Sequence, residues 1–164
     1  MTTIQFKTLI ASAAMLAAAG ASAATMTRAD YGAAKDRISA QYKADSSSCD
    51  GFSGNAKDVC VQQAKGKENV ARAELEANYT GKPDDHAKVA VVKADSTYAI
   101  AKEMCDDKAG NAKDVCVAEA KATHTKQLAD AKLEKKVGAA RQDAVEDKRE
   151  ADYKVATEKC ETLA

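Results

Sequence analysis

The sequence contains no tryptophan, and the other aromatic residues are scarce. Two Phe and five Tyr among 164 residues bring the aromatic fraction to 4%. The hydrophobic fraction of 45% comes largely from alanine. An alanine methyl group buries little area, and burial stabilises by only about 25 cal/mol per Å². This composition excludes a thick globular core and favours thin, elongated packing.

Proline is rarer still, since Pro83 is the single example. Runs of alternating β-branched residues, which are typical of strands, do not occur either. The abundant residues are alanine, lysine, glutamate and other strong helix formers. The sequence therefore predicts an all-α fold of long alanine-rich antiparallel helical hairpins or an elongated bundle.

Glycine and the lone proline divide the chain into helical segments. Breaks near 50–54, 80–85 and 106–110 predict helices over about 27–48, 55–79, 85–107 and 111–162. Both GNAKD phrases place an asparagine before a helix and an aspartate three residues later, as in a capping box. The predicted caps are Asn55, Asp58, Asn111 and Asp114. Gly138 is expected to kink or interrupt the last helix.

An excess of charge of either sign is also lacking, because 25 basic residues balance 25 acidic ones. Nucleic-acid binders need a basic stripe, so we expect no nucleic-acid partner. The charges alternate at helical spacing, for example around Glu134, Lys135 and Lys136, which is typical of a solvated helix face.

The N-terminus begins with a short apolar segment. Lys7 precedes an apolar run from Leu9 to about Ala19, and Ala21-Ser22-Ala23 matches the pattern that signal peptidase cleaves. The run is too short to span about 30 Å of hydrocarbon. We therefore expect residues 1–23 to be a cleavable signal peptide and the protein to be periplasmic. No segment within 24–164 is expected to span a membrane.

One cysteine-bracketed phrase occurs twice. CDGFSGNAKDVCVQQAK starts at Cys49, and CDDKAGNAKDVCVAEAK starts at Cys105. A tyrosine precedes Cys49, Cys105 and Cys160 at the same distance, namely Tyr42, Tyr98 and Tyr153. We expect these tyrosines to pack over a disulfide or between helices. The spacings predict an internal repeat of about 56 residues, with repeat 1 over about 27–82, repeat 2 over about 83–138 and a partial repeat 3 over about 139–164.

Each phrase places one cysteine at the end of a helix and the other at the start of the next. In an antiparallel hairpin, two such Cα atoms lie about 4.4–6.8 Å apart, as a disulfide requires. Export then favours the bonds Cys49–Cys60 and Cys105–Cys116. Each would stabilise the fold by roughly 3 kcal/mol. Cys160 is left as a free thiol, either because the third repeat stops short or because it serves an intermolecular or redox role.

These residues point to no catalytic or metal site. Neither C-x-x-C nor H-E-x-x-H occurs, and His124 is expected to be a solvated helical residue. No Cys–His nucleophile is indicated, and no cofactor is expected. The sequence favours a non-catalytic structural or interaction protein of the cell envelope, which binds envelope proteins or itself through helical faces. A small-ligand or metal-binding, stress-related helical bundle is the alternative, and a redox protein using Cys160 is a third.

Two stretches, AKGKENVARAELEANY and LADAKLEKKVGAARQDAVEDKREADYKVA, mix alanine with lysine, aspartate and glutamate. Over about residues 65–156, this composition resembles the long helical middle region of TolA, which bridges the inner and outer membranes of Gram-negative bacteria. The leader and the repeated GNAKDVC phrase are similar to small exported proteins of β-proteobacteria labelled TolA-like. The resemblance implies a periplasmic envelope protein and brings no catalytic residues. We expect the chain to depart from TolA at both ends, with a cleavable rather than an anchoring leader and without a globular C-terminal domain.

Overall fold

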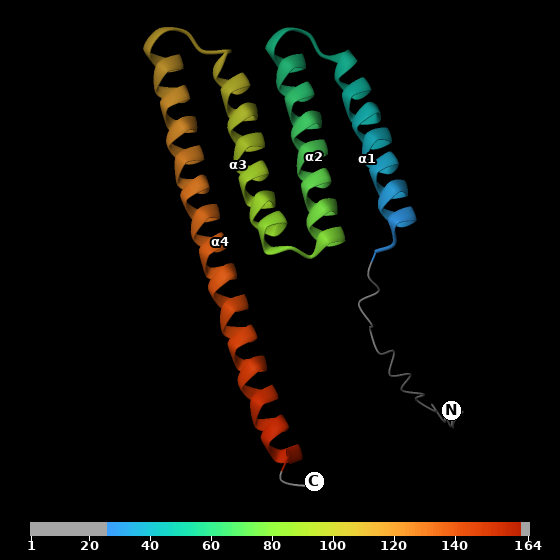
Figure 1. The fold of residues 1–164 in the computed structure, drawn as a ribbon. Coiled ribbons are helices and arrows are strands. Elements are labelled where there is room, and N and C mark those ends of the chain that lie inside the picture. The colour runs from blue at the N-terminus through green and yellow to red at the C-terminus, as the bar shows by residue number, and fades with distance from the viewer. Residues whose placement is uncertain (1–25, 162–164) are drawn as a thin grey trace, which may run out of the picture.

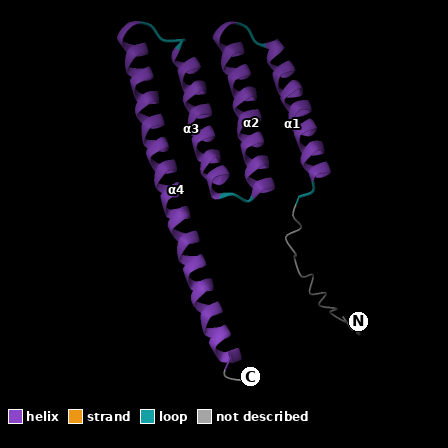
Figure 2. Cartoon of the chain, viewed as in Figure 1, coloured by secondary structure: helices purple, strands orange, loops and turns teal. Residues whose placement is uncertain are grey.

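The computed structural model describes residues 26–161, which form helices and no strand (Figure 1, Figure 2). In chain order, the elements are α1 (Arg28–Ser48), a single 3-10 turn η1 (Cys49–Gly51), α2 (Gly54–Thr80), α3 (Pro83–Cys105) and α4 (Gly110–Glu161). The all-α prediction is confirmed, and the helix limits lie close to those expected. The predicted signal peptide, residues 1–23, lies outside the described residues.

A short turn separates α2 from α3. Gly81 follows α2 with φ 64°, and its N–H donates to the carbonyl oxygen of Ala77 at 2.9 Å. Glycine adopts this left-handed conformation without the steric cost of a Cβ. Pro83 then begins α3, where no backbone N–H is required and the fixed φ of proline suits a helix. The Gly81-Lys82-Pro83 sequence therefore ends one helix and starts the next.

The helix caps differ from the predicted ones. The N-cap of α2 is Ser53, whose side chain makes no capping hydrogen bond. α2 and α4 each begin at the glycine before the predicted cap, so Asn55 and Asn111 already lie inside the first turn. An N-cap side chain must precede the helix in order to reach its free N–H groups. The predicted capping boxes, Asn55–Asp58 and Asn111–Asp114, are therefore wrong.

The helices lie side by side in one layer, and successive helices run in opposite directions (Figure 1). α2 packs against α1 and α3, and α3 packs against α2 and α4. Over residues 26–161, α1 contacts neither α3 nor α4. No helix is enclosed on all sides, because each uses at most two faces for packing.

The core consists of a few small side chains along the lines where neighbouring helices meet. In the described part of the chain, the buried apolar residues are Cys49, Ala64, Leu75, Ala77, Ala94, Cys105 and Ala131. Small residues let the helices approach closely: a Cβ at Gly66 on α2 would lie only 3.3 Å from the Cβ of Ser96 on α3. Because such a core buries little apolar area, covalent links make a large relative contribution to its stability.

α4 is the longest helix, and its second half extends beyond the other three (Figure 1). It is continuous from Gly110 to Glu161, so the expected interruption at Gly138 does not occur. Glycine costs about 1 kcal/mol in a helix interior, and the strong helix formers Ala139 and Ala140 follow it directly. Every residue from 139 to 161 is exposed.

Candidate functional site

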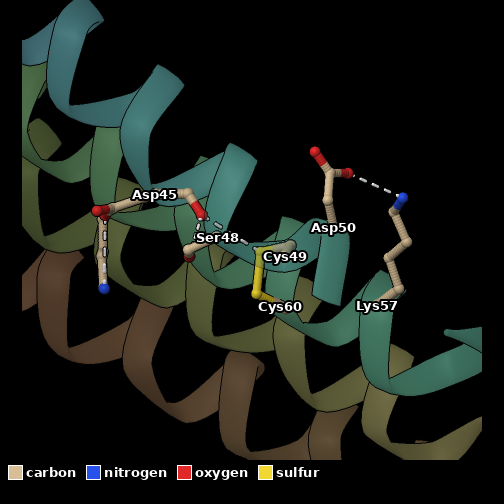
Figure 3. The surroundings of a disulfide bond; sticks show 7 residues. Asp45, Ser48, Cys49, Asp50, Lys57 and Cys60 are labelled. Carbon is tan, nitrogen blue, oxygen red and sulfur yellow. Dashed lines mark hydrogen bonds and ion pairs between the residues drawn. A yellow bond between two sulfur atoms is a disulfide. The ribbon is translucent and has the colours of Figure 1, made fainter. Parts of the chain in front are cut away.

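The first disulfide joins the end of α1 to the start of α2. Cys49 follows α1, is completely buried, and is bonded to Cys60 in the second turn of α2 (Figure 3). The two Cα atoms lie 5.6 Å apart, within the usual range for disulfides. Ser48 stabilises the end of α1, since its hydroxyl donates to the carbonyl oxygen of Asp45 at 2.6 Å. The turn is thus held by one covalent bond and a local hydrogen bond.

The second disulfide has the same geometry 56 residues later in the chain. Cys105, the last residue of α3, is completely buried and is bonded to Cys116 in the second turn of α4. The Cα atoms are 5.7 Å apart, and both disulfides join residues separated by 11 positions. These are the two pairs that the repeated phrase predicts.

An ion pair spans each turn on its outer side, and sequence reasoning missed both. Lys57 Nζ lies 3.0 Å from Asp50 Oδ1 (Figure 3), and Lys113 Nζ lies 2.9 Å from Asp106 Oδ1. The pattern was visible, because both phrases begin with CD and carry NAKD before the second cysteine. Exposed pairs contribute about 0.2–1 kcal/mol. The disulfides therefore supply most of the stabilisation in the turns.

His124 is not the solvated residue that the sequence predicts. Its side chain is only 19% exposed, and its ring stacks on Tyr98 with the ring centroids 4.7 Å apart. His124 Nε2 also lies 2.7 Å from Asp95 Oδ1. Tyr98 thus packs between α3 and α4. The predicted repeat gave no sign of this contact, because the residue 56 positions before His124 is Glu68.

Tyr31 links α1 to the far end of α2. Its ring stacks on Tyr79, with the ring centroids 4.3 Å apart, and its hydroxyl donates to the Glu76 carboxylate at 2.5 Å. The hydrogen bond to Glu76, followed by burial, raises the pKa of Tyr31 above its ordinary value of 10.0. The protonated phenol is therefore the form that the fold stabilises.

A groove of about 710 Å³ lies over α2, between α1 and α3. Its lining mixes cationic Lys35 and Arg72 with anionic Glu76 and Asp95. This volume falls in the range of small-ligand sites, about 300–1,000 Å³. Among residues 26–161, no group of three or more His, Cys, Asp and Glu side chains is placed to hold a metal ion.

Cys160 lies apart from the disulfides, as the free cysteine of the described chain, and is exposed near the end of α4. Cys116 and Cys160 lie on the same helix, about 66 Å apart at 1.5 Å per residue. Across the helices that the structure describes, none has the length and apolarity needed to cross a membrane. The fold brings Cys160 to no other site residue.

Comparison of the chain with protein-family models, curated proteins and solved structures finds no match. Function is therefore inferred from the residues and geometry of this chain.

Proposed function

We propose that the protein is an exported, non-catalytic structural or interaction protein of the cell envelope, in which disulfide-stapled antiparallel hairpins present helix faces to partners. The observation that carries this proposal is the pair of disulfides at equivalent places in two repeated phrases. Disulfides persist in oxidising compartments and are rare in the cytosol. They agree with the signal-like composition of residues 1–23 in favouring export to the periplasm.

A non-catalytic role is supported by the shape of the described region. Enzymes gather reactive groups in sites that exclude water. Here the helices form one layer, and charged residues of the groove over α2 are already engaged with protein partners. Arg72 in this groove lies 2.6 Å from Glu68, and Glu76 accepts the hydrogen bond of Tyr31. Broad helix faces are what this fold offers to a partner.

The envelope assignment also draws on the resemblance of the alanine- and lysine-rich stretches to TolA. Balanced charges along an exposed helix keep it solvated and support pairing with other helices. α4 has this character from residue 139 to 161, where every position is exposed. The partners that suit such a surface are helical segments of envelope proteins or a second copy of this chain.

The proposal is tested by intact mass spectrometry of the protein after expression in a Gram-negative host, with free thiols alkylated before and after reduction. We expect a periplasmic chain that starts near Ala24, with one alkylated thiol before reduction and five after it. A doubled mass that reduction halves would show that Cys160 links two chains. Five free thiols on a chain that retains residues 1–23 would overturn both export and the disulfide-stapled architecture.

The groove over α2 supports one alternative, a small-ligand-binding bundle. Its mixed charges suit a zwitterionic or polar organic molecule better than an apolar one. A ligand that binds only the native state raises the unfolding temperature with concentration. Thermal unfolding in the presence of amino acids, polyamines and sugars tests this, with Arg72→Ala as the control that should abolish any shift.

A further inference from the structure

The outer side of α4 carries an apolar stripe that no other helix covers. Its members recur at intervals of three, four or seven positions, which places them on one side of the helix. This α4 stripe consists of Val115, Ala122, Ala129, Leu133, Val137, Ala140, Ala144, Ala151 and Val155, with Lys126 and Lys148 interspersed. All nine apolar residues are exposed, and Leu133 and Val155 are 61% and 54% exposed.

The first half of the α4 stripe corresponds to a face that is buried in the preceding repeat. When Cys105 is aligned with Cys49, Ala122 and Leu133 fall at the positions of Gly66 and Ala77 on α2. Both of these α2 residues are buried. Gly66 faces α3 directly, since a Cβ built there would lie 3.3 Å from Ser96 and 3.4 Å from Ile100. The first half of the α4 stripe is therefore the equivalent of the α2 face that packs on α3.

The second half of the stripe corresponds to the other side of the same interface. Tyr98 and Cys105 on α3 recur with the same separation as Tyr153 and Cys160 on α4. In this alignment, Ser96 and Ile100 correspond to Ala151 and Val155. One continuous helix thus carries the counterparts of both surfaces that meet between α2 and α3. Within one chain these two halves of the stripe cannot contact each other, because both lie on the same side of a single straight helix.

The missing turn explains why α4 runs straight. The segment from Gly138 to Tyr153 is two positions shorter than its counterpart from Gly81 to Tyr98. The third copy has no equivalent of Lys82 and Pro83, which follow Gly81 in the turn. Without a proline to start a new helix, the chain after Gly138 has no reason to leave the helical conformation. Residues 139–161 consequently extend away from the first half of the α4 stripe, which they would cover if the chain turned at Gly138.

We propose that a second copy of this chain covers the α4 stripe, in an antiparallel pair of α4 helices whose twofold axis lies near Gly138. Residues 110–137 of each copy then pack against 139–161 of the other, as α2 packs against α3 within one chain. Ala122 of one copy lies against Ala151 and Val155 of the other. The inference rests on the proposed interaction role and identifies its partner.

The charges along the stripe are complementary in this arrangement. Within one chain, Lys93 Nζ on α3 lies 2.7 Å from Glu74 Oε1 on α2. The counterparts of this pair are Lys148 and Asp130, which retain the opposite charges. Val70 and Thr97, which line the same side of the α2–α3 interface, have Lys126 and Asp152 as their counterparts. The twofold symmetry forms each pairing twice, so the surface is self-complementary.

Site-specific cross-linking of the full chain tests this arrangement. Ala122→Cys and Ala151→Cys are placed in separate Cys160→Ser proteins, since the equivalent Gly66 and Ser96 lie at disulfide distance. An equal mixture under mild oxidation should give a species of twice the monomer mass. Neither variant alone should give it, because two copies of residue 122 would lie about 46 Å apart along the paired helices.

Ala156→Cys replaces Ala151→Cys in the matched control, because residue 156 lies on a different side of α4. A mixture without the covalent dimer, or one that cross-links equally well with the control, overturns the proposal. So does a doubly substituted chain, Ala122→Cys with Ala151→Cys, that closes the bond within one monomer. If the native disulfides form and the protein is exported, but the engineered cross-link does not appear, the dimer inference fails and the proposed function stands. If the native disulfides do not form and the protein is not exported, the proposed function is contradicted, whatever the yield of the engineered cross-link.

Charge reversal provides a second, independent measurement by sedimentation equilibrium. Asp130→Lys should weaken the dimer about tenfold, since two attractive pairs become repulsive. Lys148→Asp in the same chain should restore the affinity. Residues 130 and 148 are about 27 Å apart on one helix, so rescue requires contact between chains. Glu146→Lys, on the opposite side of α4, is the matched control and should leave the affinity unchanged; equal effects of both reversals would contradict the model.

Discussion

Tyr31 on α1 stacks on Tyr79 near the end of α2, with the ring centroids 4.3 Å apart, while its hydroxyl donates to Glu76. This contact fastens the end of the α1–α2 pair opposite the Cys49–Cys60 disulfide. The pair is therefore closed by a covalent bond at one end and by an aromatic contact at the other. At the aromatic end, the hydrogen bond from Tyr31 to Glu76 makes the contact sensitive to the ionisation of Tyr31.

We expect Tyr31 to ionise at higher pH than an unfolded tyrosine. Its pKa is raised because the phenol donates to the Glu76 carboxylate. The folded state holds this proton more tightly than the unfolded state, so the stabilisation is present below pH 10 and is lost as pH rises through the raised pKa. Absorbance titration of tyrosinate, with Tyr31→Phe to identify the signal, measures the shift. Glu76→Gln should return the pKa of Tyr31 toward its ordinary value; an unchanged titration in that variant would contradict this explanation.

Removal of the first disulfide should lower the free energy of unfolding by about 3 kcal/mol. Without the bond, the loop that it closed becomes open in the unfolded chain, which gains conformational entropy. The variant is Cys49→Ser with Cys60→Ser, compared by urea denaturation followed by circular dichroism. Cys160→Ser is the control and should change stability by less than about 0.5 kcal/mol, because that side chain is exposed. Equal effects of the two variants would show that the disulfide does not stabilise the fold.

A leucine at Gly66 should destabilise the protein by about 1–3 kcal/mol, because it overpacks the α2–α3 interface. A Cβ at this position would lie 3.3 Å from Ser96 Cβ. Gly32→Leu on α1 is the matched control, since a Cβ there meets no atom within 4 Å. It should stabilise by about 0.5–1 kcal/mol through helix propensity. Thermal unfolding of both variants should give shifts of opposite sign, and shifts of the same sign would refute close packing at Gly66.

Insertion of Lys–Pro between Gly138 and Ala139 should convert the dimer to a compact monomer. It restores the Gly-Lys-Pro turn between α2 and α3, so residues 139–161 fold back and cover the α4 stripe of their own chain. Insertion of Lys–Ala adds the same length without the helix-starting proline, and that chain should keep a straight α4. Small-angle X-ray scattering should report a maximum dimension well below the length of α4, about 78 Å for 52 residues, for the first insertion alone. Identical profiles for the two insertions would contradict this account of the turn.

Several features of the fold could be predicted because they depend on neighbouring residues. Pro83 and Gly81 define a turn through their own backbone preferences, which hold in almost any context. The repeated phrase likewise predicts which cysteines pair, since a short loop and a helix start bring them together. The capping prediction at Asn55 was wrong because the helix begins one residue before it, at Gly54, whose φ of 56° only glycine adopts readily. A shift of one residue moves the asparagine out of reach of the N–H groups that it was expected to cap.

The sequence by itself determined the helices, their approximate limits and the residues that form the two disulfides, because each depends on local propensity or on short spacing. The tertiary structure decided which faces meet. It placed His124 against Tyr98 and Gly66 against Ser96, contacts between residues that lie far apart in the sequence. It also showed that α4 continues through Gly138, which leaves the α4 stripe uncovered. The glycine alone suggested an interruption, but no proline follows it to start a new helix, and only the fold shows which face of the continuous helix then lacks a neighbour.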